Sequence, residues 1–333
     1  MSINRQFRIA ARPVGMVKES DFRYTEEPVP TLADGQALIR TQYLSLDPSM
    51  RGQMENRADY VAPLAIGDVM RAGGIGVVAQ SKNDTLPVGT MVSGALGMQT
   101  FAITDGRTLP LRKFAASTDP VAALGVFGGT GMTAYFGILD LGKPVAGNTV
   151  VVSGAAGATG SIAGQIAKLK GCRVIGIAGT SEKCRWLTDD LGFDGAIDYR
   201  AQDVGRELTR LCPNGIDVYF DNVGGDILDL CLARLAMNAR VVLCGGISRY
   251  NATGPLAGPV NYFNLVFRRA RMEGFIVIDY ARRFDEATRE MQIWIDAGRL
   301  KHRATVVEGF EKLPRALIAL FEGENIGKMM VKV

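Results

Sequence analysis

Three glycines spaced three residues apart, Gly154, Gly157 and Gly160, are well suited to bind a phosphate group. They follow a short β-branched run at 149–152 and precede a helical pattern at 159–170, after which a second apolar strand begins. Glycines at such a turn allow close approach of the backbone, and the N-terminus of the helix faces a pyrophosphate. The pattern therefore predicts a dinucleotide site. The alternative is that the glycines only turn the chain between strand and helix.

The end of the second strand indicates which dinucleotide binds. An NAD-dependent enzyme usually carries a carboxylate there to accept a hydrogen bond from the ribose 2′-hydroxyl. Here the strand ends at Gly179, which leaves room, and Ser181 and Lys183 offer a hydroxyl and a charge to a 2′-phosphate. Glu182 begins a helix and should point elsewhere. We expect NADP, the alternative being a helix N-cap at Thr180 or Ser181 with a solvated lysine.

Two later strands end in small or polar residues, at Phe220–Gly225 and at Leu243–Asn251. In open α/β sheets the ligand lies beyond the carboxyl ends of the strands. Asn222 and the turn at 244–250 are therefore expected to reach the nicotinamide half of the cofactor. Ordinary turn chemistry is the alternative at both positions.

Metal ligands are scarce in this sequence. The single histidine, His302, stands late in the chain and is expected at the surface. A catalytic or structural zinc needs several clustered Cys, His or carboxylate ligands, so we expect no metal. We also expect no Ser-His-Asp catalysis, unless His302 lies in the site. The cysteines include no CxxC pair and are expected to be reduced and mostly buried: Cys172, Cys184, Cys212, Cys231 and Cys244.

The composition favours a cytoplasmic enzyme. The chain has 333 residues and a net charge of +4, and no apolar run is long enough to span a membrane. The start of the sequence lacks the apolar core of a signal peptide. The basic cluster Arg268-Arg269-Ala270-Arg271 is more typical of a solvated helix face or an anionic small molecule than of nucleic-acid binding.

Two patterns divide the chain near residue 123. Before it, short strands separated by turns predict a small barrel, at 6–11, 22–26, 36–41, 75–79, 90–94 and 100–103. After a helical stretch at 122–139, strands are expected at 149–153, 173–178, 195–198, 216–221, 240–244 and 273–278. Helices are expected between them at 159–170, 181–191, 203–211, 225–236 and 282–298. This alternation predicts an α/β fold with a doubly wound parallel sheet.

A final strand at 326–333 should return to the first domain, because the parallel sheet is already complete. The predicted domains are therefore a substrate and catalytic domain at 1–123, completed by 300–333, and a Rossmann NADP-binding domain at 124–299.

Motifs along nearly the whole chain resemble the zinc-free medium-chain dehydrogenase/reductases, in particular the leukotriene hydroxydehydrogenase and prostaglandin reductase group and most of all its curcumin reductase branch. Besides the glycine turn, the motifs are LSLDPSMRG at 44–52, MTAYFGILD at 132–140, GTSEKC at 179–184, LGFDGAIDY at 191–199, YFDNVGG at 219–225, CGGISRYNA at 244–252, MEGFIV at 272–277 and GENIGKMMVKV at 323–333. Together these motifs are far more specific than any one alone.

The resemblance implies a GroES-like barrel beside a Rossmann domain, a homodimer, and NADPH-dependent reduction of a carbon–carbon double bond conjugated to a carbonyl. Gly157, Ala158, Thr159 and Gly160 would hold the pyrophosphate, Lys183 and Tyr199 the 2′-phosphate, and Asn222, Cys244, Gly245, Ser248 and Tyr250 would line the cofactor. Phe275, Ile276 and Val277 would flank the nicotinamide, and Asn325 would arrive from the C-terminal segment. Ser49 departs from the tyrosine common in relatives, which affects the expected substrate shape.

Two tyrosines are the candidate catalytic residues. Hydride transfer to the β-carbon of an enone places negative charge on the carbonyl oxygen, which a tyrosine hydroxyl can stabilise without a metal. Tyr250 is the first candidate, and Tyr60, at the position of a catalytic tyrosine in the curcumin reductase branch, is the second. Either tyrosine could instead shape the pocket by packing. An NADPH:quinone reductase and an NADPH-binding protein without turnover are the alternative functions.

Overall fold

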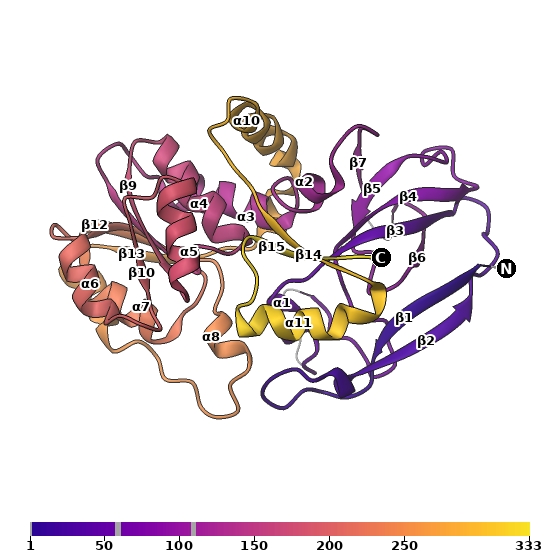
Figure 1. Ribbon diagram of the computed structural model, residues 1–333, viewed down its shortest axis with the longest axis horizontal. Coiled ribbons are helices and arrows are strands. Elements are labelled where there is room, and N and C mark those ends of the chain that lie inside the picture. The colour runs from indigo at the N-terminus through magenta and orange to yellow at the C-terminus, as the bar shows by residue number, and fades with distance from the viewer. Residues whose placement is uncertain (1, 57–60, 108–110) are drawn as a thin grey trace. The chain divides into compact units, whose positions relative to one another are not determined.

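The computed structural model describes residues 2–56, 61–107 and 111–333, and the chain divides into two compact units (Figure 1). The first unit comprises Met1–Gly125 and Ala304–Val333, and the second comprises Val126–Arg303. No helix in the described residues is long and apolar enough to cross a membrane.

The first unit is built mainly of strands. Its strands are β1 (Ile3–Ile9), β2 (Phe22–Pro28), β3 (Ala37–Ser45), β4 (Gly74–Ser81), β5 (Met91–Gly94), β6 (Phe101–Thr104), β7 (Arg112–Phe114), β14 (Ala304–Glu308) and β15 (Lys328–Lys332). β1 and β2 form an antiparallel pair, and the others form one sheet in the order β14-β15-β3-β4-β5-β7, with β6 also on β3. Its helical segments are η1 (Glu19–Asp21), α1 (Ser49–Gln53), α2 (Pro120–Leu124), η6 (Phe310–Lys312) and α11 (Leu313–Glu322).

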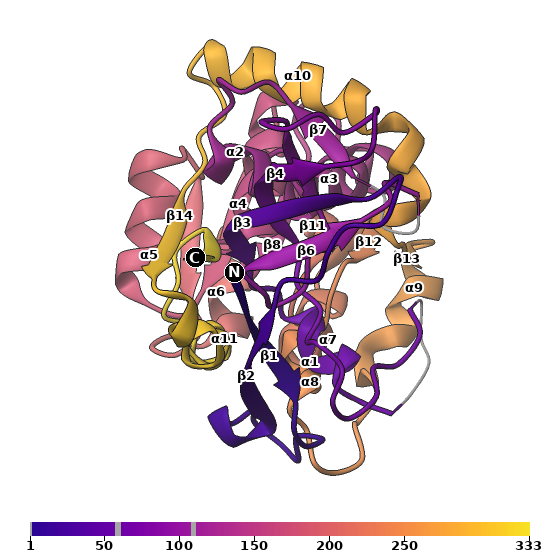
Figure 2. The same cartoon turned by 90° about the vertical axis from the view of Figure 1, so that its right-hand side faces the viewer.

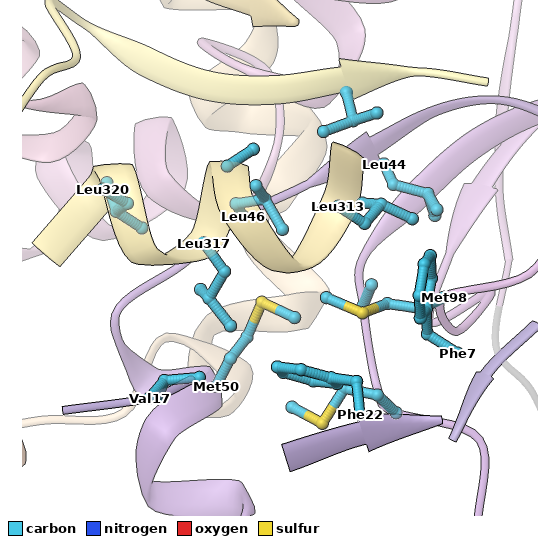
Figure 3. Close-up of a cluster of buried hydrophobic side chains, with 14 of the residues drawn as sticks. Phe7, Val17, Phe22, Leu44, Leu46, Met50, Met98, Leu313, Leu317 and Leu320 are labelled. Atoms are coloured by element: carbon cyan, nitrogen blue, oxygen red, sulfur yellow. The ribbon is translucent and has the colours of Figure 1, made fainter. Parts of the chain in front are cut away.

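The last thirty residues are part of this first sheet. β15 pairs antiparallel with β3, with Met330 opposite Ser45, and parallel with β14. Figures 1 and 2 show these yellow strands and α11 among the indigo and purple elements of the N-terminal segment. The apolar face of α11 completes the core there: Leu313, Leu317 and Leu320 pack with Phe7, Phe22, Leu44 and Met50 (Figure 3). The hydrophobic effect thus fixes the C-terminal segment to the first unit.

A buried lysine holds the loop that precedes α1. The Lys328 ammonium donates hydrogen bonds to the Leu46 carbonyl and to Asp47 Oδ1, both at 2.7 Å. Lys328 is 4% exposed, so its ammonium group is shielded from water, whereas the Asp47 side chain is partly exposed. Ser49, the departure noted in the sequence, begins α1 directly after this loop.

The second unit contains a six-stranded parallel sheet in the order β10-β9-β8-β11-β12-β13. The strands are β8 (Thr149–Ser153), β9 (Arg173–Ala178), β10 (Gly195–Asp198), β11 (Ile216–Asp221), β12 (Leu235–Leu243) and β13 (Arg271–Gly274). In chain order this is 3-2-1-4-5-6, the doubly wound order whose direction reverses between β8 and β11. The predicted α/β fold with a parallel sheet is confirmed.

Helical segments connect these strands. They are α3 (Gly129–Phe136), η2 (Gly137–Gly142), α4 (Ala158–Leu169), α5 (Ser181–Arg185), η3 (Trp186–Asp190), α6 (Val204–Leu211), α7 (Gly225–Leu232), α8 (Ile247–Tyr250), η4 (Val260–Phe263), α9 (Asn264–Phe267), η5 (Val277–Arg283) and α10 (Phe284–Asp296).

The helical stretch predicted at 122–139 is interrupted. α2 ends at Leu124 and α3 begins at Gly129, so the prediction of one continuous helical stretch is wrong. A Cβ on Gly131 would lie 1.7 Å from the Val126 carbonyl oxygen, so the chain turns closely back on itself before α3. Only a glycine permits that approach.

Two strand boundaries also differ from the prediction. β12 begins at Leu235 rather than at 240, because α7 ends early and the strand passes through an irregularity around Asn238, whose φ is +61°. β13 ends at Gly274 rather than continuing to 278, because η5 begins at Val277. Phe275 and Ile276 therefore lie between a strand and a 3₁₀ helix.

Candidate functional site

The glycine turn after β8 brings the N-terminus of α4 close to the strand end. Gly154 has φ +56°, and a Cβ on Gly160 would lie 2.5 Å from the Gly154 carbonyl oxygen. Gly157 is the N-cap, and no side chain caps the helix. The first-turn amides of Ala158, Thr159 and Gly160 have no acceptor within the helix, so they can donate to an anion.

The ends of β8 and β11 meet at this turn. A Cβ on Gly154 would lie 3.3 Å from the Asn222 Cβ. Asn222 donates from Nδ2 to the Ser153 carbonyl at 2.7 Å, and its backbone amide donates to Ser153 Oγ at 2.9 Å. The predicted positions Gly157–Gly160 and Asn222 therefore lie at the point where the strand order reverses, where doubly wound sheets bind ligands.

A buried carboxylate holds the turn after β11. Asp221 is 1% exposed, and its Oδ1 accepts hydrogen bonds from Ser153 Oγ at 2.8 Å and from the Tyr219 hydroxyl at 2.7 Å. The backbone amides of Val223 and Gly224 also donate to Oδ1, both at 3.0 Å. Sequence reasoning missed Asp221 and Ser153 as parts of this site, because nothing in their spacing shows that they meet.

The ring of Tyr199, which follows β10, lies against the end of β9. A Cβ on Gly179 would lie 2.9 Å from Tyr199 Cε1, so the absence of a side chain at Gly179 lets the half-exposed Tyr199 ring approach the strand end. Thr180 is the N-cap of α5, and its hydroxyl accepts from the Lys183 amide at 3.2 Å. The alternative N-cap interpretation is thus correct for Thr180.

Two cations gather beside this strand end. Burial lowers the pKa of Lys183, and the neighbouring Arg200 charge lowers it further, while Glu182 opposes the shift. Arg200 also lies over the Tyr199 ring, with its Cζ 5.8 Å from the ring centroid. Asp198 is engaged elsewhere, accepting from Ser181 Oγ and from the Arg200 amide. Like charges repel each other, so this arrangement favours an anionic ligand. Arg200 was not predicted, although its place directly after Tyr199 was a usable signal.

The turn after β12 approaches the same edge. A Cβ on Gly245 would lie 3.4 Å from the Asn222 carbonyl oxygen. Ser248 Oγ donates to the Val223 carbonyl at 2.7 Å, and the Tyr250 hydroxyl accepts from the Gly246 amide at 3.2 Å. Burial and the nearby Asp221 raise the pKa of the Cys244 thiol to about 12, so the thiol stays neutral.

The other predicted positions lie in different surroundings. The Phe275 ring packs inward, because a Cβ on Gly137 would lie 2.7 Å from its Cζ. Ile276 and Val277 are partly buried. Asn325 belongs to the first unit and donates from Nδ2 to the Gly327 carbonyl at 2.7 Å. Tyr60 lies outside the described residues.

Residues that could bind a metal are dispersed. Over residues 2–56, 61–107 and 111–333, no three His, Cys, Asp or Glu side chains are grouped so that they could hold a metal ion. His302 is exposed, as expected. Three of the five cysteines, Cys172, Cys212 and Cys231, are buried.

Two family models match the chain. Residues 5–111 match the N-terminal domain of oxidoreductase, and residues 158–292 match a family described as zinc-binding dehydrogenase. The second match begins at Ala158, within the glycine turn, and covers α4 and the strands that follow it.

Several characterised or named proteins are similar over almost their whole length. The chain is 46% identical to a putative NADP-dependent oxidoreductase, YfmJ, of Bacillus subtilis and 42% identical to the NADPH-dependent curcumin reductase of Escherichia coli, covering 99% of this chain and 97% of each relative. It is 39% identical to prostaglandin reductase 1 of Bos taurus, covering 96% of both chains.

A solved structure is similar at the same level. The crystal structure of CurA from Vibrio vulnificus in complex with NADPH matches with a TM-score of 0.94 and 44% identity, covering 99% of both chains. Identity of this extent over the full length of several relatives decides the family. The chain is a member of the medium-chain dehydrogenase/reductase superfamily and belongs to its group of curcumin and prostaglandin reductases, NADP-dependent oxidoreductases that reduce double bonds.

Proposed function

We propose that this protein uses NADPH to reduce the carbon–carbon double bond of α,β-unsaturated ketones and aldehydes. The observation that carries the proposal is the combination at one sheet edge of an uncapped helix N-terminus with the cations Lys183 and Arg200. A dinucleotide pyrophosphate suits the first feature and a 2′-phosphate suits the second. The similarity to a curcumin reductase supports a conjugated carbonyl compound as the substrate.

The residues present fit NADPH. A Cβ on Gly160 would clash with the Gly154 carbonyl oxygen and one on Gly179 with the Tyr199 ring, so these glycines let the N-terminus of α4 approach the end of β8 and the Tyr199 ring approach the end of β9. In the proposed complex the α4 amides bind the pyrophosphate, and Lys183, Tyr199 and Arg200 bind the 2′-phosphate. Asn222, Gly245 and Ser248 border the nicotinamide half.

The bound cofactor supplies a hydride to the β-carbon of the enone. Negative charge then develops on the carbonyl oxygen of the substrate, where a hydrogen-bond donor lowers the barrier. We assign this role first to the Tyr250 hydroxyl. The Gly246 amide donates to the Tyr250 oxygen, and such a bond stabilises negative charge on that oxygen as its proton moves toward the substrate. Tyr60 is the second candidate, and the α-carbon receives its proton from a tyrosine or from water.

The experiment is an NADPH-oxidation assay over enones, enals and quinones, with the product identified by mass spectrometry. We expect a saturated carbonyl product and a larger kcat/KM for enones than for quinones. Tyr250→Phe and Tyr60→Phe are compared with Tyr24→Phe, whose exposed hydroxyl binds Glu26 on β2. A preference for quinones would favour the alternative quinone reductase, and unchanged kcat/KM in both Tyr250→Phe and Tyr60→Phe would remove the tyrosine assignment.

We also infer that the chain forms a homodimer, as the family resemblance implies. Exposed apolar side chains on η4 and α9 support an interface with a second copy: Val260, Phe263, Val266 and Phe267 are each more than half exposed. Apolar clusters of this kind usually mark an interaction surface. Light scattering should give the mass of a dimer, and Val266→Asp with Phe267→Asp should give a monomer; a monomeric wild type would contradict the inference.

A further inference from the structure

A polar hollow of about 530 Å³ lies on the second unit, away from the strand ends described above. Its walls come from the end of η2, from β12 and β13, and from η5. Figure 1 labels the two strands β12 and β13. The charged side chains that line it are Asp140, Lys143, Arg240, Arg271 and Glu273, and Tyr280 also lines it.

Two arginines stand side by side in this hollow. Arg240 on β12 is the register partner of Arg271 on β13, so both side chains project from the same face of the parallel pair. Like charges directly opposite each other on a sheet are destabilising. Arg271 is also the last residue of the basic cluster at 268–271, for which the sequence favoured a solvated face or an anionic small molecule.

The fold does not neutralise this charge. In the described residues, Arg240, Arg271 and Lys143 have no carboxylate within ion-pair distance. Asp140 is already bound to Arg283. Glu273 is the remaining carboxylate of the hollow, which leaves an excess of two positive charges.

Tyr280 supplies a neutral donor at the same place. Its ring is stacked on Phe136 with the centroids 4.6 Å apart, which fixes the position of the hydroxyl. Burial, followed by Asp140 and Glu273, raises the pKa of Tyr280, so the hydroxyl stays protonated. A fixed hydroxyl beside guanidinium groups is a donor set suited to an oxyanion.

We propose that this hollow binds a small dianion, either a phosphate ester or a dicarboxylate, through Lys143, Arg240 and Arg271. The site is separate from the predicted cofactor site. Arg240 lies three residues before Leu243, where β12 ends, which corresponds to about 10 Å along the strand. The proposal therefore does not depend on the proposed function.

The test is calorimetric titration of the NADPH-saturated protein with inorganic phosphate and, separately, with succinate. We expect at least one of them to bind, and Arg240→Gln/Arg271→Gln to weaken that binding by roughly ten-fold or more, as the loss of charged donors implies. Binding of inorganic phosphate would identify the ligand as a phosphate ester, and binding of succinate would identify it as a dicarboxylate. Arg206→Gln, on the exposed side of α6, removes one charge elsewhere in the same unit and should leave the Kd unchanged.

Two further variants keep the result interpretable. Arg271→Gln alone changes an exposed residue and serves if the double variant is unstable. Lys312→Gln removes an exposed charge in the first unit and should retain the anion affinity. Absence of binding to the wild type, or an equal Kd in the arginine variants, overturns the proposal. The proposal is also overturned if the wild type binds no anion and the arginine variants change the oligomeric mass, because the charges would then belong to a contact with a second copy.

Discussion

The buried Asp221 carboxylate offers a sharp test of how the candidate site is held. The change Asp221→Asn keeps the size of the side chain and removes its charge. The four groups that donate to Oδ1 are the Ser153 and Tyr219 hydroxyls and the Val223 and Gly224 amides, and the Gly224 amide also lies 3.1 Å from Oδ2. An asparagine accepts through only one atom, so its amide nitrogen would face the Gly224 donor.

The expected cost follows from that arrangement. Hydrogen bonds to charged groups contribute about 1.5–3 kcal/mol each, and a buried donor left without an acceptor costs about 1–3 kcal/mol. Because most of the bonds survive in a weaker neutral form, we expect the unfolding free energy to fall by about 2–4 kcal/mol. In a domain of this size such a loss lowers the Tm by at least about 4 °C.

The assay combines thermal unfolding with steady-state kinetics. Asp221→Asn should lower the Tm and raise the KM for NADPH, because the turn that carries Asn222 loses its anchor. Asp84→Asn, an exposed position in the first unit, is the matched control and should change neither quantity. A Tm and a KM for Asp221→Asn equal to those of the control would refute the claim that this network holds the turn.

Three further predictions concern neighbouring positions. Gly160→Ala places a Cβ 2.5 Å from the Gly154 carbonyl oxygen, so it should lower the free energy of unfolding by about 1–3 kcal/mol and weaken NADPH binding in a fluorescence titration. Gly254→Ala, which has open space around it, should be neutral in both measurements. Equal NADPH binding by both variants would contradict the packing argument. Arg200→Gln removes the like charge that lowers the pKa of Lys183, so Lys183 should lose its proton at a higher pH than in the wild type. NADPH binding should then be weaker at neutral pH but persist to higher pH. An unchanged pH profile of the Kd for NADPH would argue against coupling between Arg200 and Lys183. Because the pKa of Cys244 is about 12, less than about one thousandth of this thiol should be ionised at pH ~8. Mass spectrometry should therefore find Cys244 unmodified by iodoacetamide under conditions that alkylate a free thiol. Rapid alkylation of Cys244 would show that its surroundings differ.

The sequence predicted the parallel sheet because its central strands, such as β8 and β9, are short apolar runs bounded by glycine or polar residues. It did not predict the interruption between α2 and α3, since Ala122 and Met132 both continue a helical pattern and the turn depends on contact between Gly131 and the Val126 carbonyl. It also missed the early start of β12, because the irregularity near Asn238 separates the apolar residues of that strand.

The same distinction applies to the candidate site. Gly160, Gly179 and Lys183 could be proposed from spacing alone, since they fall at fixed distances from recognisable strands. Asp221 could not, because its role arises from a contact with Ser153 at the end of another strand. The position of Arg200 directly after Tyr199 was a usable signal, but spacing could not show that Arg200 approaches Lys183, because that proximity depends on how β9 and β10 align.

The central claim is that a hydride from NADPH reaches the β-carbon of a conjugated carbonyl compound. The most direct measurement uses NADPH deuterated at C4 of the nicotinamide on the transferred face, with an acyclic enone, and locates the label in the product by NMR. The account predicts a saturated ketone that carries deuterium on the β-carbon. Deuterium on the former carbonyl carbon, in an allylic alcohol, would contradict it.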